Sequence, residues 1–463
     1  MPPNVSLAHA PVLDPGFLPA SKWNRAFRER VAATPGSSTD LAIGLEQPGG
    51  SLSVTRTRIL PHVGEGIALN ETHVERMVKF LLWQRGGSRL LIGGSPEIAR
   101  MLQEKYSPSG LRHFDAKFIG EKIYREPLRV ESLALEAMPG ERQPTVALGR
   151  HLKGCRIGFD LGGSDRKTSA VMDGKVVFTE EVPWDPYFQK DPQYHLEGIR
   201  HSLARAAAHL PRVDAIGGSA AGCYVDNEVR AASLFRGVSE ADFESKVRRM
   251  FHQLRAEWNN VPFEVVNDGE VTALAGSMSL NDNCVLGISM GTSEAAGYVD
   301  GDGHITTWLN ELAFAPVDYR ADAPADEWSG DVGCGVQYFS QQAVARLAPK
   351  AGIAFAAEIP FAERLVEVQR LMKAGDERAA AIYDTIGTCF GYAIAGYAEF
   401  YTIRNILVLG RVTSGEGGEI LLKKAATVLR EEFPELAGIA LRTPDEQMKR
   451  HGQAVAAASL PAI

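Results

Sequence analysis

The sequence has few cysteines, no excess of basic residues and no long apolar run. Its five cysteines are scattered without a C-x-x-C spacing, and such an odd set is typical of reduced thiols in a cytosolic protein. The formal net charge of −8 argues against broad affinity for nucleic acid or for anionic membranes. The most apolar stretch, 386–403, is interrupted by three glycines and by Glu399, so it predicts a buried helix rather than a membrane span.

The first residues also lack the pattern of a secretory signal. Residues 1–23 contain five prolines, and no basic segment is followed there by an apolar one. Together with the cysteine usage, this predicts a cytoplasmic protein whose partners include neither a membrane nor a nucleic acid.

The chain is long enough for several domains. Its 463 residues allow about three, and its content of 45% hydrophobic and 23% charged residues is ordinary for a soluble protein. Residues 1–65 are rich in Pro, Gly, Ser and Thr and predict irregular structure wrapped over another part of the molecule. Helical spacing begins after Asn70, a strand is expected at 90–92, and Ser95-Pro96 opens the next helix. We therefore expect a small α/β domain within 1–150, whose role the sequence does not assign.

One pattern of strands and turns occurs twice, at a domain-sized separation. The expected strands are 156–160, 168–172 and 175–179 in the first copy, and 284–290, 295–299 and 304–308 in the second. Helical stretches fill the intervals, so the sequence predicts α/β layers in two related lobes. Lobe I is expected at 151–270 and lobe II at 271–463, and a last helix, opened by a capping box at 443–446, is expected to return to lobe I.

Each copy carries a short turn that suits the phosphates of a nucleotide. The turns are Gly162-Gly163-Ser164 and Gly291-Thr292-Ser293. Glycines let the backbone approach phosphate oxygens closely, while backbone N–H groups and hydroxyls donate hydrogen bonds. Asp160 precedes the first turn and is placed to hold Mg²⁺ through water. Each turn alone is equally compatible with an ordinary hairpin, and Asp160 with a turn-capping residue, but the repetition favours phosphate binding.

A carboxylate lies in the segment 265–270, which is expected to be a strand that leads into the helical run 271–278. In α/β proteins such a junction faces the ligand cleft, and in phosphoryl transfer a carboxylate orients and deprotonates the attacking hydroxyl. Asp268 is therefore the candidate catalytic base. The alternative is that Asp268 is an ordinary N-cap of the helix.

A set of segments between about 155 and 460 resembles the ROK family, which groups sugar kinases with related repressors. The segments are 158–164 (G-F-D-L-G-G-S), 216–225 (I-G-G-S-A-A-G-C-Y-V), 267–268 (N-D), 291–293 (G-T-S), 407–417 (L-V-L-G-R-V-T-S-G-E-G) and 451–458 (H-G-Q-A-V-A-A-A). No single segment is decisive, but their order is that of the family.

The resemblance implies a duplicated two-lobe fold of the actin-like ATPase (ribonuclease H-like) class, here with an extra N-terminal α/β region. It implies that Asp268 is the catalytic base and that Asn267 and Glu311 contact hydroxyls of the sugar. It also implies that the two turns and Gly410 bind ATP, that Asp160 binds Mg²⁺, and that the protein forms a homodimer or a larger homo-oligomer.

The chain departs from the family pattern at several site positions. The lysine expected after the first turn is Asp165, with Lys167 shifted onward. Phe314 stands in place of a zinc-binding histidine, and only one thiolate of the zinc motif remains at 327–336, so no zinc is expected because structural zinc needs a near-complete ligand set. Arg411 interrupts the glycine run on the adenosine side. The substrate pocket is therefore rebuilt, and ordinary glucose phosphorylation is not assumed.

The sequence thus predicts an Mg·ATP-dependent kinase that phosphorylates a hydroxyl of a sugar, a sugar derivative or a polyol. The main alternative is a non-catalytic ROK-type sugar sensor or transcriptional regulator. Its DNA-binding helices would have to lie at 71–85, 96–105 and 108–113, but the strand expected at 90–92 and the balanced charge of this region argue against them. A second activity or an oligomer interface within 1–150 is a third possibility, and the identity of the acceptor is not predicted.

Overall fold

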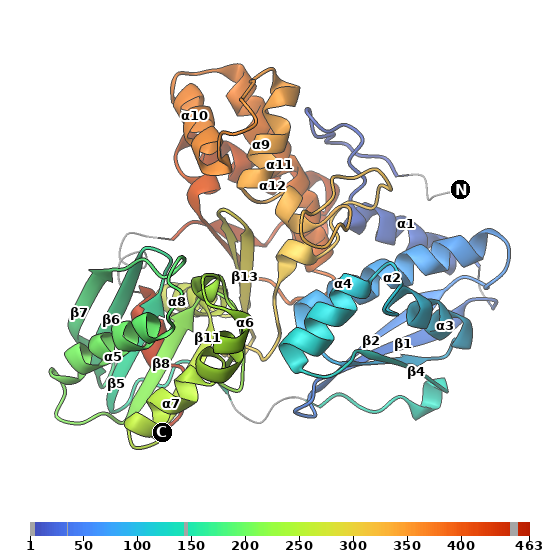
Figure 1. Ribbon diagram of the computed structural model, residues 1–463. Coiled ribbons are helices and arrows are strands. Elements are labelled where there is room, and N and C mark those ends of the chain that lie inside the picture. Colours follow the sequence, from blue (N-terminus) through green and yellow to red (C-terminus); the bar gives the residue numbers. More distant parts are fainter. Residues whose placement is uncertain (1–4, 35, 143–146, 445–451) are drawn as a thin grey trace.

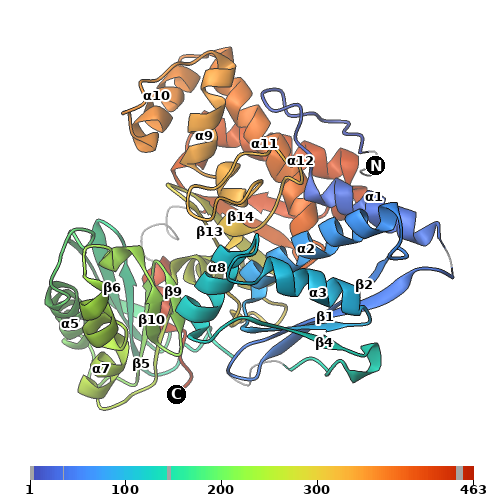
Figure 2. The same ribbon diagram turned by 45° about the vertical axis from the view of Figure 1, so that its right-hand side comes forward.

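The computed structural model describes residues 5–34, 36–142, 147–444 and 452–463, which form three α/β parts. Figure 1 shows the N-terminal domain in blue and cyan, lobe I in green and lobe II in yellow to red. After a rotation of 45°, Figure 2 shows the N-terminal domain in front, next to both lobes. In the described part of the chain, no helix combines the length and the apolar character that crossing a membrane requires.

The N-terminal domain is a four-stranded sheet, in the order β2-β1-β3-β4, packed against helices. Strand β1 pairs antiparallel with β2 and β3, and β3 pairs parallel with β4. Trp23, Phe27 and Trp83 are among the buried residues that fill the core between the sheet and the helices. The elements are α1 (Ala20–Ala32), β1 (Thr39–Glu46), β2 (Leu52–Ile59), α2 (Glu65–Arg85), β3 (Arg89–Gly93), α3 (Pro96–Lys105), α4 (His113–Asp115), η1 (Ala116–Tyr124) and β4 (Arg129–Leu133).

The irregular structure expected over 1–65 is present at 5–18 and wrong for 20–59. Residues 5–18 run along lobe II, where the buried Asp14 forms an ion pair with Arg346. Residues 20–59 form α1, β1 and β2, because one cluster of turn-forming Pro, Gly and Ser residues lies between the two strands at 47–51 and lets the flanking residues pair.

Two further expectations for this domain can be compared with the structure. The strand at 90–92 is confirmed as β3, and Ser95 caps α3 by accepting a hydrogen bond from the backbone N–H of Ile98. Helix α2, however, begins at Glu65 and not after Asn70. The side-chain amide of Asn70 lies buried inside the helix, bonded to the backbone N–H and C=O of Leu60 at 2.9 and 2.8 Å. Asn70 therefore anchors the chain that leaves β2 instead of capping the helix.

Lobe I is built on a five-stranded sheet in the order β11-β8-β5-β6-β7. Strands β5, β6 and β7 form an antiparallel meander, while β8 and β11 run parallel to β5. The elements are β5 (Cys155–Leu161), β6 (Asp165–Met172), β7 (Lys175–Pro183), α5 (Gln193–Ala207), β8 (Ala215–Ala220), β9 (Cys223–Val225), β10 (Glu228–Ala231), α6 (Glu240–Asp242), η4 (Phe243–Val247), α7 (Met250–Glu257) and β11 (Phe263–Asn267).

Lobe II repeats this arrangement without its outer meander strand. Its sheet has the order β13-β12-β14-β15, in which β12 is antiparallel to β13 and parallel to β14. The elements are α8 (Asp268–Leu280), β12 (Val285–Met290), β13 (Glu294–Val299), η5 (Leu312–Phe314), η6 (Gly335–Gln337), α9 (Gln341–Leu347), α10 (Phe361–Lys373), α11 (Glu377–Tyr397), β14 (Asn405–Leu409), η8 (Arg411–Thr413), α12 (Glu416–Glu432) and β15 (Ala440–Arg442).

The strand expected at 304–308 is wrong. Within this segment only Ile305 forms β-bridges, and they are isolated. The chain then turns to the carboxyl end of α2, where the backbone N–H groups of Asn310 and Glu311 donate to the carbonyls of Gln84 and Trp83, both at 2.9 Å. The last carbonyls of a helix lack partners within the helix, so α2 competes successfully for this segment.

The C-terminal helix α13 (Gln453–Ala458) packs on the sheet of lobe I. Glycines at 158 on β5 and 217 on β8 allow this contact, because a Cβ at either position would lie 1.7 Å from a backbone oxygen of the helix. Two glycines of the family-like segments therefore serve packing rather than ligand binding. The capping box at 443–446 and the first residue of the closing segment, His451, lie wholly or partly outside the described residues.

Candidate active site at the junction of the lobes

Asp160 lies at the end of β5, directly before the first glycine turn. Its Oδ1 accepts a hydrogen bond of 2.6 Å from Ser219 Oγ on the neighbouring strand β8. Burial is the main reason that its pKa is raised to about 6, and the Asp268 carboxylate adds to this effect, while Ser219 and Lys167 oppose it. Asp160 Oδ2 receives no hydrogen bond from the described residues, so this oxygen is available to a ligand.

Lys167 is a cation of this site that the sequence reasoning missed. It lies directly opposite Asp160 in the antiparallel pairing of β5 and β6, and its Nζ is 3.3 Å from Asp165 Oδ1. Burial acts to lower the pKa of Lys167, but the carboxylates of Asp165 and Asp160 outweigh it and raise that pKa. The sequence signal that could have located Lys167 is the register of the expected hairpin, because a turn at 162–164 places residue 167 opposite residue 160.

Asp268 is the first residue of α8, immediately after β11. The N-cap is Asn267, whose Oδ1 accepts from Gly269 N at 2.7 Å and whose Nδ2 donates to Gly222 O at 2.8 Å. The alternative that Asp268 is the cap is therefore wrong. Asp268 is half-buried, its Oδ1 accepts from Gly269 N at 3.0 Å, and burial raises its pKa.

Glu311 approaches this junction from the segment that the N-terminal domain holds. Its Oε1 accepts a hydrogen bond from the thiol of Cys223 at 3.4 Å. Burial raises the pKa of Glu311 to about 7, and the Asp268 carboxylate contributes to this rise. The charge of Asp268 thus contributes to the raised pKa of both Asp160 and Glu311.

The two glycine turns are accessible and held by their surroundings. In the first turn, Gly162 O accepts a hydrogen bond of 2.7 Å from the indole N–H of Trp184, and Ser164 is exposed. In the second turn, Gly291 O accepts from Gln341 N at 2.9 Å, while Thr292 and Ser293 are exposed. The hydroxyls of both turns can therefore reach a ligand from fixed backbone positions.

A cavity of about 950 Å³ lies between the lobes. Its walls include Lys167 from lobe I and Gly410 and Arg411 from lobe II. The backbone of Gly410 has a φ of 103°, and a Cβ there would lie 2.4 Å from Met290 O, so the tight contact with the end of β12 requires glycine. Of the predicted site residues, Gly410 lines this cavity, whereas the two turns, Asp160, Asp268, Asn267 and Glu311 do not.

The region of the degenerate zinc motif is held by side chains of the N-terminal domain. Phe314 stacks on Trp83 with ring centroids 4.2 Å apart. The buried Lys79 of α2 binds Asp115 at 2.9 Å and also Asp331 of the motif loop, and Arg112 binds both Asp331 and Glu75. We call these five charged residues the interdomain ion cluster. Among the described residues, no three His, Cys, Asp or Glu side chains converge as a metal site would require.

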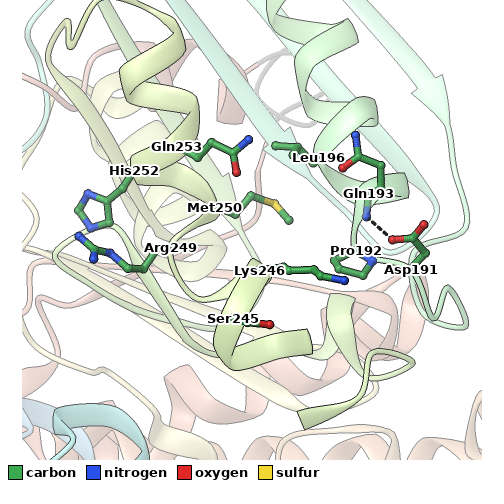
Figure 3. A pocket seen from close by; sticks show the side chains of 10 residues that line it. All are labelled: Asp191, Pro192, Gln193, Leu196, Ser245, Lys246, Arg249, Met250, His252 and Gln253. Carbon is green, nitrogen blue, oxygen red and sulfur yellow. Dashed lines mark hydrogen bonds between the residues drawn. The ribbon is translucent and has the colours of Figure 1, made fainter. Parts of the chain in front are cut away.

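A second hollow, of about 560 Å³, lies on lobe I alone (Figure 3). Helix α5 contributes Gln193 and Leu196 to its walls, and the segment from η4 to α7 contributes Lys246 and Arg249. Both cations have carboxylate neighbours, because Lys246 lies 2.7 Å from Asp242 and Arg249 lies 3.6 Å from Glu228. No predicted site residue lines this hollow, so the junction of the lobes is the candidate active site.

Two lobes that repeat one strand order and enclose a cleft define the duplicated actin-like ATPase fold, here with an N-terminal α/β domain added. No protein-family model and no curated protein sequence matches the chain. Among solved structures, a ROK hexokinase from Thermus thermophilus is similar with a TM-score of 0.52 and 19% identity, covering 66% of this chain and 96% of that chain.

Two further solved structures belong to the same family. A ROK family transcriptional regulator, a homolog of the E. coli MLC protein, has a TM-score of 0.52 and 18% identity, covering 67% of this chain and 79% of that chain. A ROK family glucokinase from Streptomyces griseus, in complex with glucose and AMPPNP, has a TM-score of 0.48 and 19% identity, covering 66% of this chain and 98% of that chain. The hexokinase and the regulator, each with a TM-score of 0.52, show that the chain has the fold of ROK family proteins, and the resemblance indicated by its motifs is confirmed at the level of the fold.

Proposed function

We propose that this protein is an Mg·ATP-dependent kinase that transfers a phosphoryl group to a hydroxyl of a sugar, a sugar derivative or a polyol. The observation that carries the proposal is the position of Asp268. This carboxylate starts α8 at the junction of the lobes, and its charge raises the pKa of Asp160, which lies near the first turn, and the pKa of Glu311, the proposed acceptor-binding residue. A base between a phosphate site and an alcohol site is what phosphoryl transfer to an alcohol requires.

On this proposal, the residues divide the work as follows. Asp268 accepts the proton of the attacking hydroxyl, and its raised pKa makes it a better base than an exposed aspartate. Glu311 and Asn267 orient the acceptor. Because Asn267 also caps α8, only the second N–H of its Nδ2 and the second lone pair of its Oδ1 are available to the acceptor. The backbone N–H groups and hydroxyls of the two turns, together with Lys167, hold the phosphates.

Asp160 fits a magnesium-binding role, because one of its oxygens is fixed by Ser219 and the other is available. We propose that it holds Mg²⁺ through water, and the bound ion would neutralise charge on the phosphates. We also propose that the loop 327–336 folds without zinc, since Asp331 is held by Lys79 and Arg112 instead.

The second candidate function is a sugar-responsive regulator, and the likeness to a ROK transcriptional regulator favours it. Against it, the N-terminal domain is organised around the sheet formed by β1 to β4. Strand β3 pairs with both β1 and β4 where the regulator hypothesis needs a turn between DNA-binding helices. The kinase proposal therefore takes precedence.

The test is a phosphorylation screen with Mg·ATP over hexoses, amino sugars, polyols and inositols, run beside Asp268→Asn. We expect turnover of at least one acceptor by the wild type and a loss of about 10²- to 10⁴-fold in the variant, at an unchanged melting temperature. The matched control is Asp282→Asn, because Asp282 is exposed and pairs with Arg404 away from the junction. Equal activity of Asp268→Asn and wild type would remove the base role, and specific DNA binding without turnover of any acceptor would favour the regulator.

A further inference from the structure

Arg411 is an uncompensated cation in the wall of the interlobe cavity. It is exposed, it lines the cavity, and it forms no ion pair with any described residue. Glu419 lines the same cavity and is also exposed, but it does not bind Arg411. An exposed arginine in a cavity that also contains a carboxylate, yet not bound to it, is available to an anionic ligand.

The backbone of Arg411 is fixed, so its guanidinium starts from a defined place. Gly410 packs against the end of β12, directly before the second glycine turn. The backbone carbonyl of Arg411 accepts a hydrogen bond of 2.7 Å from Gln369 Nε2. Arg411 therefore lines the cavity at the carboxyl ends of the parallel strands β12 and β14. The turn Gly291-Thr292-Ser293 follows β12 at the same end of the sheet.

Lys167 enters the same cavity from the opposite lobe. Its charge is already shared, because Asp165 and Asp160 both interact with it. Arg411 forms no ion pair with a carboxylate of the described residues, so among those residues it carries most of the positive charge still available to a ligand in the cavity. A triphosphate needs several positive partners, and the first turn is followed by an aspartate rather than by a cation.

We propose that Arg411 binds the phosphate chain of the nucleotide from lobe II, opposite Lys167 on lobe I. This inference rests on the proposed kinase function and adds a binding residue to it. A planar guanidinium can give two parallel hydrogen bonds to one phosphate group, which an ammonium group cannot. A nucleotide held by one cation from each lobe also favours the closed arrangement of the two lobes.

The proposal is tested by titrating ATP, ADP and adenosine against the wild type, Arg411→Ala and Arg411→Lys. We expect Arg411→Ala to weaken ATP and ADP binding about 10- to 100-fold and to leave adenosine binding unchanged. Arg411→Lys retains the positive charge but not the two parallel N–H donors of the guanidinium, so its ATP and ADP affinities should lie between those of the wild type and Arg411→Ala. The matched control is Arg404→Ala, since Arg404 lies just before the opposite end of β14 and its side chain is also exposed.

In steady-state kinetics, Arg411→Ala should raise the KM for ATP and leave the KM for the acceptor unchanged. Unchanged ADP affinity in a folded Arg411→Ala protein would overturn the proposal while the kinase function stands. An equal loss for ADP and adenosine would also overturn it, because the guanidinium would then contact the base or the ribose. Absence of nucleotide binding to the wild type would overturn both this proposal and the kinase proposal.

Discussion

The protein holds charged groups away from solvent in two neighbouring regions, and their partners differ. The groups are fully buried in the interdomain ion cluster, whereas Asp268 and Glu311 at the junction of the lobes are half-buried. In the interdomain ion cluster, every carboxylate contacts a cation: Glu75 contacts Arg112, Asp115 contacts Lys79, and Asp331 contacts both. At the junction of the lobes, Asp268 and Glu311 contact no cation among the described residues. Their hydrogen bonds come from a backbone N–H and from a thiol.

The difference separates charges that hold the architecture from charges kept for a ligand. A buried ion pair gains little net stability when intact, but it becomes costly when one partner is removed. A buried carboxylate without a partner lowers stability all the time, and proteins retain such groups where function needs a raised pKa. The ion cluster is therefore expected to govern folding, and the junction carboxylates are expected to govern chemistry.

The largest effect on stability is expected from breaking the ion cluster. Lys79→Met leaves Asp115 and Asp331 without their shared ammonium in a fully buried position. We expect a loss of about 3–5 kcal/mol in the free energy of unfolding, measured by urea denaturation. The loss should affect the N-terminal domain and lobe II together, because the cluster joins them.

The matched control for this variant is Lys246→Met, which removes an exposed lysine paired with Asp242. An exposed pair of this kind contributes about 0.3–0.5 kcal/mol, so the control should be close to wild type. If Lys79→Met unfolded at the same urea concentration as the control, the cluster would not hold the two parts together.

Most of the charged residues at the junction of the lobes could be predicted from the sequence, whereas the pairing within the interdomain ion cluster could not. The turns, Asp160 and Asp268 stand beside strand ends, and local patterns locate strand ends. In the ion cluster, Lys79 contacts Asp115 and Asp331, which lie 36 and 252 residues away in the sequence. No local pattern indicates such a pairing, so the departure from the zinc motif could be read from the sequence, but the ion pairs that hold Asp331 could not.

The fold itself was predictable to a similar extent. Repetition of strand and glycine turn correctly indicated two related lobes. The strand expected at 304–308 failed because the carboxyl end of α2 captures the segment that follows it, which is a tertiary effect. Strand β2 was missed because its Ser, Thr and Arg residues resemble a loop in composition. Strand β1 was missed although residues 41–45 are apolar and buried, because the flanking turn-forming residues dominated the composition of the segment.

A smaller effect, of the opposite sign, is expected at the junction. Folding raises the pKa of Glu311 from an ordinary value of 4.5 to about 7, so the folded state holds this proton more tightly than the unfolded state. The contribution of Glu311 to the free energy of unfolding is therefore most favourable below pH 4.5, and this contribution is lost as the pH rises towards 7. Glu311→Gln should be more stable than wild type by about 1–3 kcal/mol at pH 8 and nearly equal at pH 4.5.

Glu131→Gln provides the contrast for this measurement. Hydrogen bonds from Arg89 lower the pKa of Glu131, so removing its charge should reduce stability above that pKa rather than increase it. Thermal melts of both variants from pH 4.5 to 8 give the comparison. A Glu311→Gln protein that is less stable than wild type at pH 8 would mean that the carboxylate has a cationic partner and belongs with the ion cluster.

The smallest effect is expected at the hydrogen bond that Glu311 accepts from Cys223, the one side-chain donor to it in the described part of the chain. Cys223 is buried and donates its thiol proton, and a thiol is a weak donor. Cys223→Ser supplies a stronger donor, and Cys223→Ala supplies none, so the pKa of Glu311 should be lower in the serine variant than in the alanine variant. The stability difference between the two variants should therefore increase by about 0.5–1 kcal/mol between pH 4.5 and 8, in favour of serine.

The same pair of variants in the Glu311→Gln background separates this hydrogen bond from the cost of burying a hydroxyl. A buried hydroxyl has the same cost at every pH, and the pH-dependent part should disappear once the carboxyl group is gone. If the difference between serine and alanine kept its pH dependence without Glu311, another titrating group would be responsible. If it vanishes, the pH dependence comes from the Cys223 thiol, the only side-chain donor to Glu311 among the described residues, and the second carboxylate oxygen of Glu311 stays available to a bound alcohol.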